Sequence, residues 1–525
     1  MAQNAVVGEV SAVFNPVQFT RQASRTFTRE RTRFRDVFVD AYSAVLVLGT
    51  VGAFAAGLVL ALREQVARAW EVDPGGRTLV APPSLALPEG SAVTALLFAV
   101  LVAVVVLARK LGPAAVTTAE GYWWLSLPLD RRPLVTGRLL RRLALVWAGA
   151  SVLYLPIGFI TDLDAGVPGQ FLAGAVFGVA AVSAVLLAAL RQIGAGQAGS
   201  GSSGPGPGGR IVSGPLPGLV LLAVLSFVPR QAAAGLWGPA LVAVAAAVGL
   251  GLIVFPRLGA IPARDLISAG GVSGHAGAAV YLMDPNEVGR ALSGDSGAVV
   301  STRAGRWYAR GGRTPFGALL RADTVAFLRT RGWLGRPVLL LLLCVVLLLT
   351  GGNQPVALQL ALIAATVFAA VPAAGALARR TAVTPGLDVL LPLSPALVRL
   401  SRMVLPAAVL AVWAAVSTAV LVLLGAGSPE LIVLGALAGV GFGASAVRGA
   451  YRTQPDWTVP PTDTVFGPVP TAQTGAMIRG LDTTLLALVP LLLGLFLGYA
   501  PGVLLLAQAG FSAVCVLLLM FSNPK

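Results

Sequence analysis

The stretch that decides the fold of this chain covers residues 122–147 and reads YWWLSLPLDRRPLVTGRLLRRLALVW. It joins two long apolar runs through aromatic residues, a Leu-Pro-Leu turn and a cluster of basic residues. A similar stretch, LDVLLPLSPALVRLSRMVLPAAVLAVW, covers residues 387–413. Two pairs of residues share one offset of 264 positions, namely Pro128 with Pro392 and Arg138 with Arg402. Because self-similarity at a fixed spacing indicates an internal repeat, the sequence predicts two copies of one module.

The composition indicates a membrane protein. The 525 residues are 56% hydrophobic and only 11% charged, and the mean hydropathy is +0.83. Soluble domains carry roughly 25% charged residues. Apolar runs of about 20 residues, long enough to cross a bilayer as helices, recur along the whole chain. We therefore predict an all-α polytopic membrane protein with about twelve spans in two pseudo-repeated six-helix bundles. The predicted spans cover residues 42–62, 92–111, 139–161, 170–190, 215–229, 236–255, 337–351, 355–378, 403–424, 429–447, 484–499 and 501–521.

The polar segments between the spans complete the predicted organisation. Each module begins with a basic amphipathic stretch, over residues 17–41 and 316–336, of the kind that lies along a membrane surface. The Gly/Ser-rich tract over residues 194–209 reads as a flexible linker. The predicted division is a first permease module over residues 1–255, a cytoplasmic connector over residues 256–314 and a second permease module over residues 315–525.

The basic residues predict the orientation of the chain. With the N-terminus inside, the external loops hold only four of the 38 lysines and arginines, which are Arg63, Arg68, Arg77 and Arg230. This asymmetry follows the positive-inside rule and predicts that both termini are cytoplasmic. It also accounts for the net charge of +16 without a nucleic-acid partner.

Several kinds of catalytic site are disfavoured by the sequence. A phosphate-binding loop ends in Gly-Lys-Ser/Thr, and neither Lys110 nor Lys525 follows a glycine. We therefore expect no ATP hydrolysis by this chain and no enzymatic activity of its own. The single histidine, His275, lies in a Gly-rich segment predicted to be a solvated loop, and Cys344 and Cys515 lie within apolar runs as inert thiols. No cofactor or metal site is predicted.

The candidate functional residues lie in the polar loop that follows the second span of each module. These loops would present charged and aromatic side chains to the cytoplasm beside the membrane. Ordinary anchoring at the membrane surface by tryptophan and arginine is the simpler alternative. The candidate residues are Glu120, Leu127, Pro128, Asp130, Arg131, Arg132 and Arg138 in the first loop, and Asp388, Pro392, Ser394, Arg399 and Arg402 in the second.

The order of a basic surface helix, two spans, this loop and four further spans resembles the permease subunits of ABC-2-type exporters. The matching positions of the first loop are Leu125, Leu127, Pro128, Leu129, Arg131, Arg132, Gly137, Arg138 and Leu139. The second loop keeps Leu391, Pro392, Leu393, Ser394 and Arg402 but lacks the double arginine and the glycine. The chain is also similar to fused permeases of actinobacteria that occur with a separate ATPase.

The resemblance implies a function, a location and partners. The chain would be the transmembrane subunit of an ATP-driven exporter in the bacterial plasma membrane. Separate ATPase subunits would dock on the two loops, and a small-molecule, lipid or peptide cargo would pass along the interface of the two halves. Charge reversal at Arg131 and Arg132 would then abolish coupling without affecting insertion into the membrane.

Two other classes of protein fit the same layout. A secondary carrier of the six-plus-six type also has twelve spans and a central cytoplasmic loop. Proton-coupled carriers usually place ionisable residues within their helices, and here almost none falls well inside a predicted span. A non-transporting membrane scaffold is the third possibility, which a bundle interior without any cavity would favour.

Overall fold

The computed structural model describes the chain from the second predicted span onward. The described residues are 91–125, 127, 130–161, 166–198, 215–282, 284–293, 306–307, 314–329, 335–350, 356–382, 385–452, 462–464, 467–469 and 478–521, with single residues and pairs between 19 and 80. The predicted surface helix over residues 17–41, the first span and most of the 194–209 linker therefore lie largely outside the described residues.

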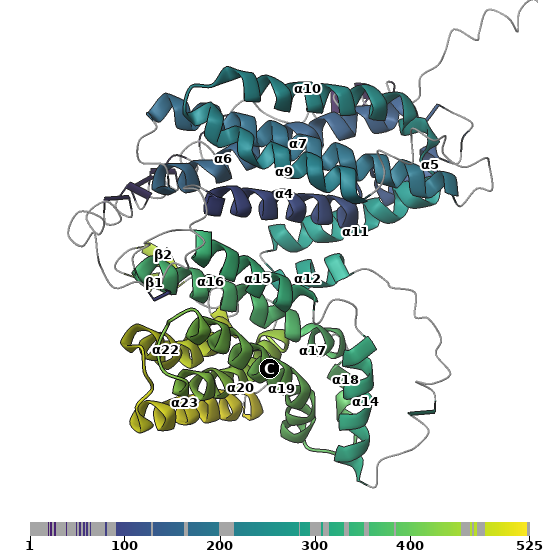
Figure 1. The fold of residues 1–525 in the computed structure, drawn as a ribbon. Helices are drawn as coiled ribbons and strands as arrows, with labels where there is room; N and C mark the ends of the chain where they lie inside the picture. The colour runs from purple at the N-terminus through teal and green to yellow at the C-terminus, as the bar shows by residue number, and fades with distance from the viewer. Residues whose placement is uncertain are drawn as a thin grey trace, which may run out of the picture.

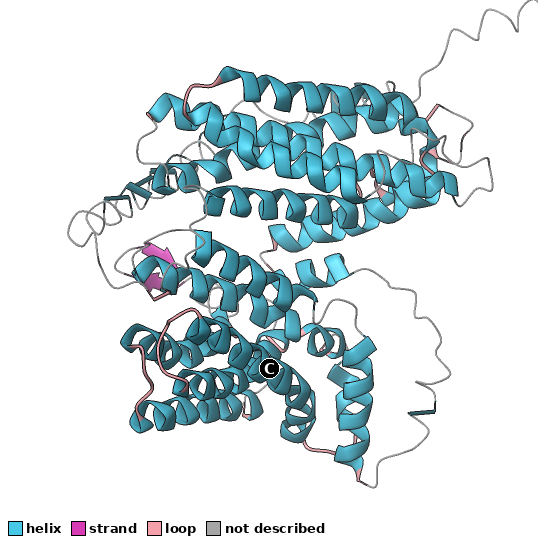
Figure 2. Cartoon of the chain, viewed as in Figure 1, coloured by secondary structure: helices cyan, strands magenta, loops and turns pink. Residues whose placement is uncertain are grey.

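Nearly every described residue is helical (Figure 2), and the described strands form one short antiparallel hairpin. The longer helices are α4 (Ser91–Leu111), α6 (Arg132–Thr161), α7 (Val167–Ala198), α9 (Pro215–Ala233), α10 (Trp237–Val254), α11 (Ala263–Tyr281), α14 (Pro315–Arg329), α15 (Gly335–Thr350), α16 (Val356–Ala374), α19 (Pro395–Leu423), α20 (Glu430–Ala450), α22 (Leu481–Leu497) and α23 (Gly502–Met520). The shorter elements are α5 (Thr118–Trp124), η1 (Phe255–Ala260), α12 (Pro285–Ser293), α17 (Ala376–Thr381), α18 (Pro385–Val389), β1 (Thr462–Thr464) and β2 (Gly467–Val469).

The helices have the length and composition of membrane spans. Within the described part of the chain, nine are long and apolar enough to cross a bilayer, and α15 and α22 are shorter apolar helices. Many large apolar side chains on them face outward, as on Leu252 of α10 and Leu506 of α23, which are 72% and 75% exposed. A lipid-facing surface accounts for this exposure, since hydrocarbon surrounds a spanning helix. The prediction of a helical polytopic membrane protein is confirmed.

The first bundle is organised around α7, which packs against α4, α6, α9 and α10. Tyr154 of α6 lies against Phe177 of α7, with ring centroids 5.8 Å apart. A Cβ atom at Gly178 of α7 would lie 2.7 Å from the carbonyl oxygen of Trp147 on α6. Only a glycine allows the two backbones to approach this closely. The apolar core also takes in Leu266 of α11, which lies within the predicted connector.

The second bundle is organised around α20, which packs against α16, α19, α22 and α23. On α20, Gly435, Gly439 and Gly443 recur at every fourth position and face α19. A side chain at Gly443 would collide with the backbone of Ala407, so the small residues set the distance between these two helices. The indole nitrogen of Trp413 donates to the carbonyl oxygen of Pro337 at 2.9 Å and joins α19 to α15.

The two bundles lie one above the other in Figure 1 and meet where α4 packs against α15. At the opposite end of α16 from α17, the side chain of Gln359 accepts the backbone N–H groups of Leu79, at 2.9 Å, and Val80, at 3.3 Å. These two residues belong to the predicted external loop of the first module, yet they are buried in the second core. The division into modules itself remains a prediction.

Two local features differ from what the sequence indicated. The third predicted span of each module begins at residue 139 or 403, and the helix that contains it begins earlier, α6 at Arg132 and α19 at Pro395. Ser394 caps α19 by accepting the N–H of Leu397 at 3.4 Å, and a proline at the first helical position favours the helix. The Gly-rich region around His275, predicted to be a loop, is the helix α11. Of its glycines, Gly270 allows close packing against the segment at Val116, a role that the sequence pattern alone did not distinguish from a turn.

Candidate functional site

Two bends of the chain hold the predicted functional residues. We define the first elbow as residues 112–138, between α4 and the second turn of α6, and the second elbow as residues 375–402, between α16 and the third turn of α19. Figure 1 shows α5 of the first elbow and α17 and α18 of the second at the same end of the two bundles. This common position makes the two elbows the candidate site.

An ion pair holds the first elbow against the long helix that follows it. Thr117 caps α5 and forms a capping box with Glu120, whose Oε2 accepts the Thr117 hydroxyl at 2.6 Å. The other carboxylate oxygen of Glu120 pairs with the guanidinium of Arg138 on α6. Asp130 accepts the N–H of Arg132 at 3.0 Å and so caps the start of α6. Glu120 therefore fixes both the start of α5 and its position against α6.

Three helices hold the segment that leads into α5. Arg142 of α6 donates to the carbonyl oxygens of Gly112 and Pro113, at 2.6 and 3.2 Å. Gln192 of α7 pairs with both backbone groups of Ala114, at 3.1 and 3.2 Å. A side chain at Gly270 of α11 would fall on the carbonyl oxygen of Val116, so α11 lies directly on this segment. These contacts attach the first elbow to the helices of its own bundle.

A more buried ion pair holds the second elbow. Arg402 of α19 binds both carboxylate oxygens of Asp388 on α18, with one contact at 2.7 Å. The side chain of Arg402 is 4% exposed and that of Asp388 is 20% exposed. The ring of Tyr451 lies beneath the guanidinium groups of Arg402 and Arg399, with centroid distances of 5.6 and 5.9 Å. Such cation–π contacts stabilise buried arginines.

Two further contacts join the second elbow to distant parts of the chain. Arg399 donates to the carbonyl oxygens of Leu519 and Met520 at the end of α23, at 3.3 and 3.2 Å. Ser401 donates to Asp323 of α14 at 3.0 Å. Burial of Asp323 raises the pKa of its carboxyl, while the Ser401 hydroxyl and the positive charge of Arg402 act in the opposite direction.

Apolar side chains remain exposed beside both ion pairs. In the first elbow Tyr122 is 74% exposed, Trp123 is 68% exposed, and the two rings meet edge to face. In the second elbow Val389 and Leu390 are 82% and 78% exposed. Exposed apolar residues grouped in this way mark a surface that contacts a membrane or another protein.

The predicted site residues fall into two groups in the structure. Those that lie at least partly on the surface are Glu120, Leu127, Asp130, Arg131, Arg132, Arg138, Asp388, Pro392 and Ser394. Arg399 and Arg402 are buried and bind within the chain. Pro128 lies outside the described residues. The sequence analysis missed Asp323, Tyr451 and Gly270, because each acts through a contact with a segment far away in the chain.

A second polar group lies between α11 and α12. The Nε2 atom of His275 is 2.9 Å from the carboxylate of Glu287, which also pairs with Arg290 one turn later on α12. Among the residues that the structure describes, no group of three histidine, cysteine or acidic side chains could hold a metal ion.

Comparison with known proteins places the chain in a family. The sequence profile of a family of unknown function, DUF6297, matches residues 89–460. The chain belongs to the DUF6297 family. The match runs from α4 to just beyond α20, so both elbows lie inside the DUF6297 region. Searches among curated proteins and among solved structures found no match.

Proposed function

We propose that the chain is the transmembrane permease subunit of an ATP-driven exporter, with separate ATPase subunits docking on the two elbows. The observation that carries this proposal is the position of the elbows at one end of two neighbouring bundles. Each elbow combines an internal arginine–carboxylate pair with exposed apolar residues. A docking site needs these two features together, a rigid attachment and an exposed surface.

An internal repeat would give the two elbows equivalent roles. The pairs of packed helices correspond between the halves: α7 with α4, α6, α9 and α10 matches α20 with α16, α19, α22 and α23. In both halves α9 and α10, or α22 and α23, also contact each other. With the first predicted span and the two shorter apolar helices included, this arrangement favours twelve spans as two sets of six.

The ion pairs support the same correspondence. Arg138 and Arg402, which the 264-residue offset relates, each bind a carboxylate from the short helix that precedes the third span of their half. The carboxylates themselves, Glu120 and Asp388, do not share this offset. The same type of ion pair therefore forms in both halves, although its acidic residue stands at different positions. This indicates that each half requires the ion pair itself and not one particular acidic residue.

The buried contacts suggest how movement of an ATPase would reach the membrane. A partner that pulls on the exposed residues of the second elbow would move α18, and the Arg402–Asp388 pair would carry the displacement to α19. Arg399 and Ser401 would pass it on to α23 and α14. Arg399 and Arg402 thus act inside the chain, and the exposed residues make the contact.

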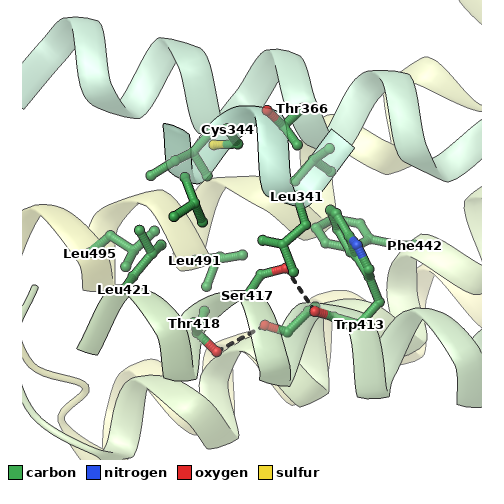
Figure 3. A pocket seen from close by; sticks show the side chains of 14 residues that line it. Leu341, Cys344, Thr366, Trp413, Ser417, Thr418, Leu421, Phe442, Leu491 and Leu495 are labelled. Atoms are coloured by element: carbon green, nitrogen blue, oxygen red, sulfur yellow. Dashed lines mark hydrogen bonds between the residues drawn. The ribbon is translucent and has the colours of Figure 1, made fainter. Parts of the chain in front are cut away.

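The cargo path is proposed along the interface between the halves. The interior of the second bundle contains a cavity of about 30 Å³, lined among others by Leu341, Trp413 and Phe442 (Figure 3). Since about 10 to 15 Å³ of such space is enough for one water molecule, the cavity has room for only a few waters and is too small for a cargo molecule. A passage would therefore form where α4 meets α15, when the two bundles move relative to each other.

The distribution of charge in the described helices supports one orientation. The elbow end carries arginines on several helices, for example Arg109 on α4, Arg191 on α7 and Arg448 on α20. At the opposite end of the bundle, Arg230 lies in the last turn of α9. By the positive-inside rule the elbows face the cytoplasm of a bacterial cell, where ATP is available, and both termini are cytoplasmic.

Charge reversal at the first elbow tests the docking role. Arg131→Glu with Arg132→Glu should reduce ATPase co-purification and ATP-dependent transport by at least about tenfold, because two cations on the exposed turn become anions. Insertion and thermal stability should stay unchanged, since neither guanidinium forms an ion pair with a described residue. Arg264→Glu, on the exposed start of α11, is the matched control. Full transport by the double variant would contradict the proposal.

A further inference from the structure

A cavity of about 630 Å³ opens at the elbow end of the second bundle, where Arg379 of the second elbow forms part of its lining. Residues of α12, α15, α16, α17, α20 and the start of α22 line it. Its volume lies within the range of about 300 to 1,000 Å³ that small-molecule sites occupy. It is large enough for a ligand, whereas the cavity in the bundle interior is not.

The walls of this cavity differ in chemistry. One side is apolar and includes Leu339, Leu340 and Phe368. The charged lining residues are four arginines, Arg336, Arg379, Arg452 and Arg479, and none of the lining residues is acidic. The combination of an apolar wall with several guanidinium groups fits a molecule that has a hydrocarbon part and an anionic head.

The arginines at this cavity outnumber the carboxylates that act on them, and they repel one another. Burial, together with repulsion from Arg336, Arg452 and Arg290, lowers the pKa of Arg379 to about 10. Asp284 is the carboxylate whose charge acts on Arg452, whereas Asp482 pairs with Arg448, and Glu287 pairs with Arg290 and His275. An anion in the cavity would relieve the repulsion among the arginines.

The corresponding end of the first bundle differs. A cavity of about 300 Å³ lies there between α4, α7 and α11, lined by Arg109, Lys110 and Arg191. Its lining also includes the carboxylate of Asp265 and no large apolar side chain besides Val272. A carboxylate repels an anionic head, so the two cavities do not share a ligand.

We propose that the larger cavity binds the phosphate group of an anionic lipid. The planar guanidinium groups of Arg379 and Arg452 suit the bidentate recognition of phosphate oxygens, and Arg336 adds charge at the rim. The acyl chains lie along the wall formed by α15 and α16, whose outward residue Leu339 is 62% exposed toward the surrounding bilayer. Basic pockets between spanning helices on the cytoplasmic side bind lipid head groups in this manner. The proposal does not depend on the exporter function.

Native mass spectrometry of the detergent-purified full chain tests the site. The probes are dioctanoyl phosphatidic acid, dioctanoyl phosphatidylcholine with the same chains, and inorganic phosphate. Phosphatidic acid should bind one per chain, and Arg379→Gln should weaken this binding by about tenfold or more, as expected for a lost hydrogen bond to a charged group. Arg380→Gln, the adjacent exposed residue of α17 that does not line the cavity, should bind as the wild type does.

Arg336→Gln provides a second variant at an exposed position, where a folding defect is not expected. It should weaken phosphatidic acid binding while leaving thermal stability unchanged. Equal binding of phosphatidic acid and phosphatidylcholine, or unchanged binding in both variants, would overturn the proposal. Inorganic phosphate that displaces the lipid at equal concentration would also overturn it, because the cavity would then recognise a free anion without using its apolar wall.

Discussion

At the scale of single residues, burial separates the two arginine–carboxylate pairs. The side chains of Arg138 and Glu120 are 26% and 30% exposed, whereas those of Arg402 and Asp388 are 4% and 20% exposed. Water screens the attraction between Arg138 and Glu120, and it would hydrate the charge of either residue if the other were removed. A lone partner of the second pair would remain as an uncompensated buried charge.

Removing each arginine should therefore have unequal effects. We expect Arg402→Gln to lower the free energy of unfolding by about 3 kcal/mol, since breaking a buried pair leaves Asp388 without its cation. Arg138→Gln should cost less than about 1 kcal/mol. Thermal unfolding of the detergent-solubilised variants compares the two, with Arg380→Gln as the exposed control. Equal losses at the two positions would show that the difference in burial has no energetic consequence.

Asp323 should make the stability of the chain depend on pH. Its pKa is raised in the folded state, mainly by burial, so the folded chain holds this proton more tightly than the unfolded chain does. The resulting stabilisation is complete below the ordinary aspartate pKa and disappears as the pH rises through the raised pKa. Wild-type stability should decline across that window relative to Asp323→Asn, whose side chain stays neutral.

Melting temperatures of the wild type and Asp323→Asn, measured from pH 4 to pH 8, check this expectation. The variant should gain stability relative to the wild type as the pH increases. Ser401→Ala should shift the dependence further, because it removes the hydroxyl that stabilises the carboxylate. A difference that shrinks with rising pH would mean that Asp323 is stabilised as an anion.

At the scale of helices, close backbone contacts position the elbows. Gly270 and Gly271 are neighbours on α11, but only Gly270 faces the first elbow. Gly270→Ala should displace α11 from Val116 and lower stability by about 2 kcal/mol, in the range of overpacking in a tight core. Gly271→Ala has open space and should be neutral or stabilising by up to about 1 kcal/mol, since alanine favours the helix. The pair is compared by thermal unfolding, and equal effects would contradict the packing of α11 on the elbow.

The sequence predicted the spans well and the elbows only in part. Runs of apolar residues are local features, so the limits of α4, α16 and α23 lie within about four residues of the predictions. Local signals for the early starts of α6 and α19 were also present, in Asp130 before Pro133 and in Ser394 before Pro395. The burial of Arg399 and Arg402 could not be predicted, because it depends on Tyr451, Asp323 and α23, which approach only in the folded chain.

At the scale of the whole molecule, the two bundles form a two-part body with most of its charge at one end. Their elbows lie at that end, and the DUF6297 match spans both of them. The contact of Leu79 and Val80 with Gln359 joins the two bundles at the other end. In the proposed exporter, a movement of the elbows would reach the interface between α4 and α15 through these contacts.

The most direct measurement is a mild-detergent purification of the tagged chain from its native membrane, followed by identification of the proteins bound to it. The account predicts a stoichiometric partner with a Gly-Lys-Ser/Thr nucleotide loop. This partner should be lost when Tyr122→Ala and Trp123→Ala are combined, because these exposed rings belong to the proposed docking surface of the first elbow. A chain that purifies without an ATPase, yet moves a solute along an ion gradient in liposomes, would contradict the account and identify a secondary carrier.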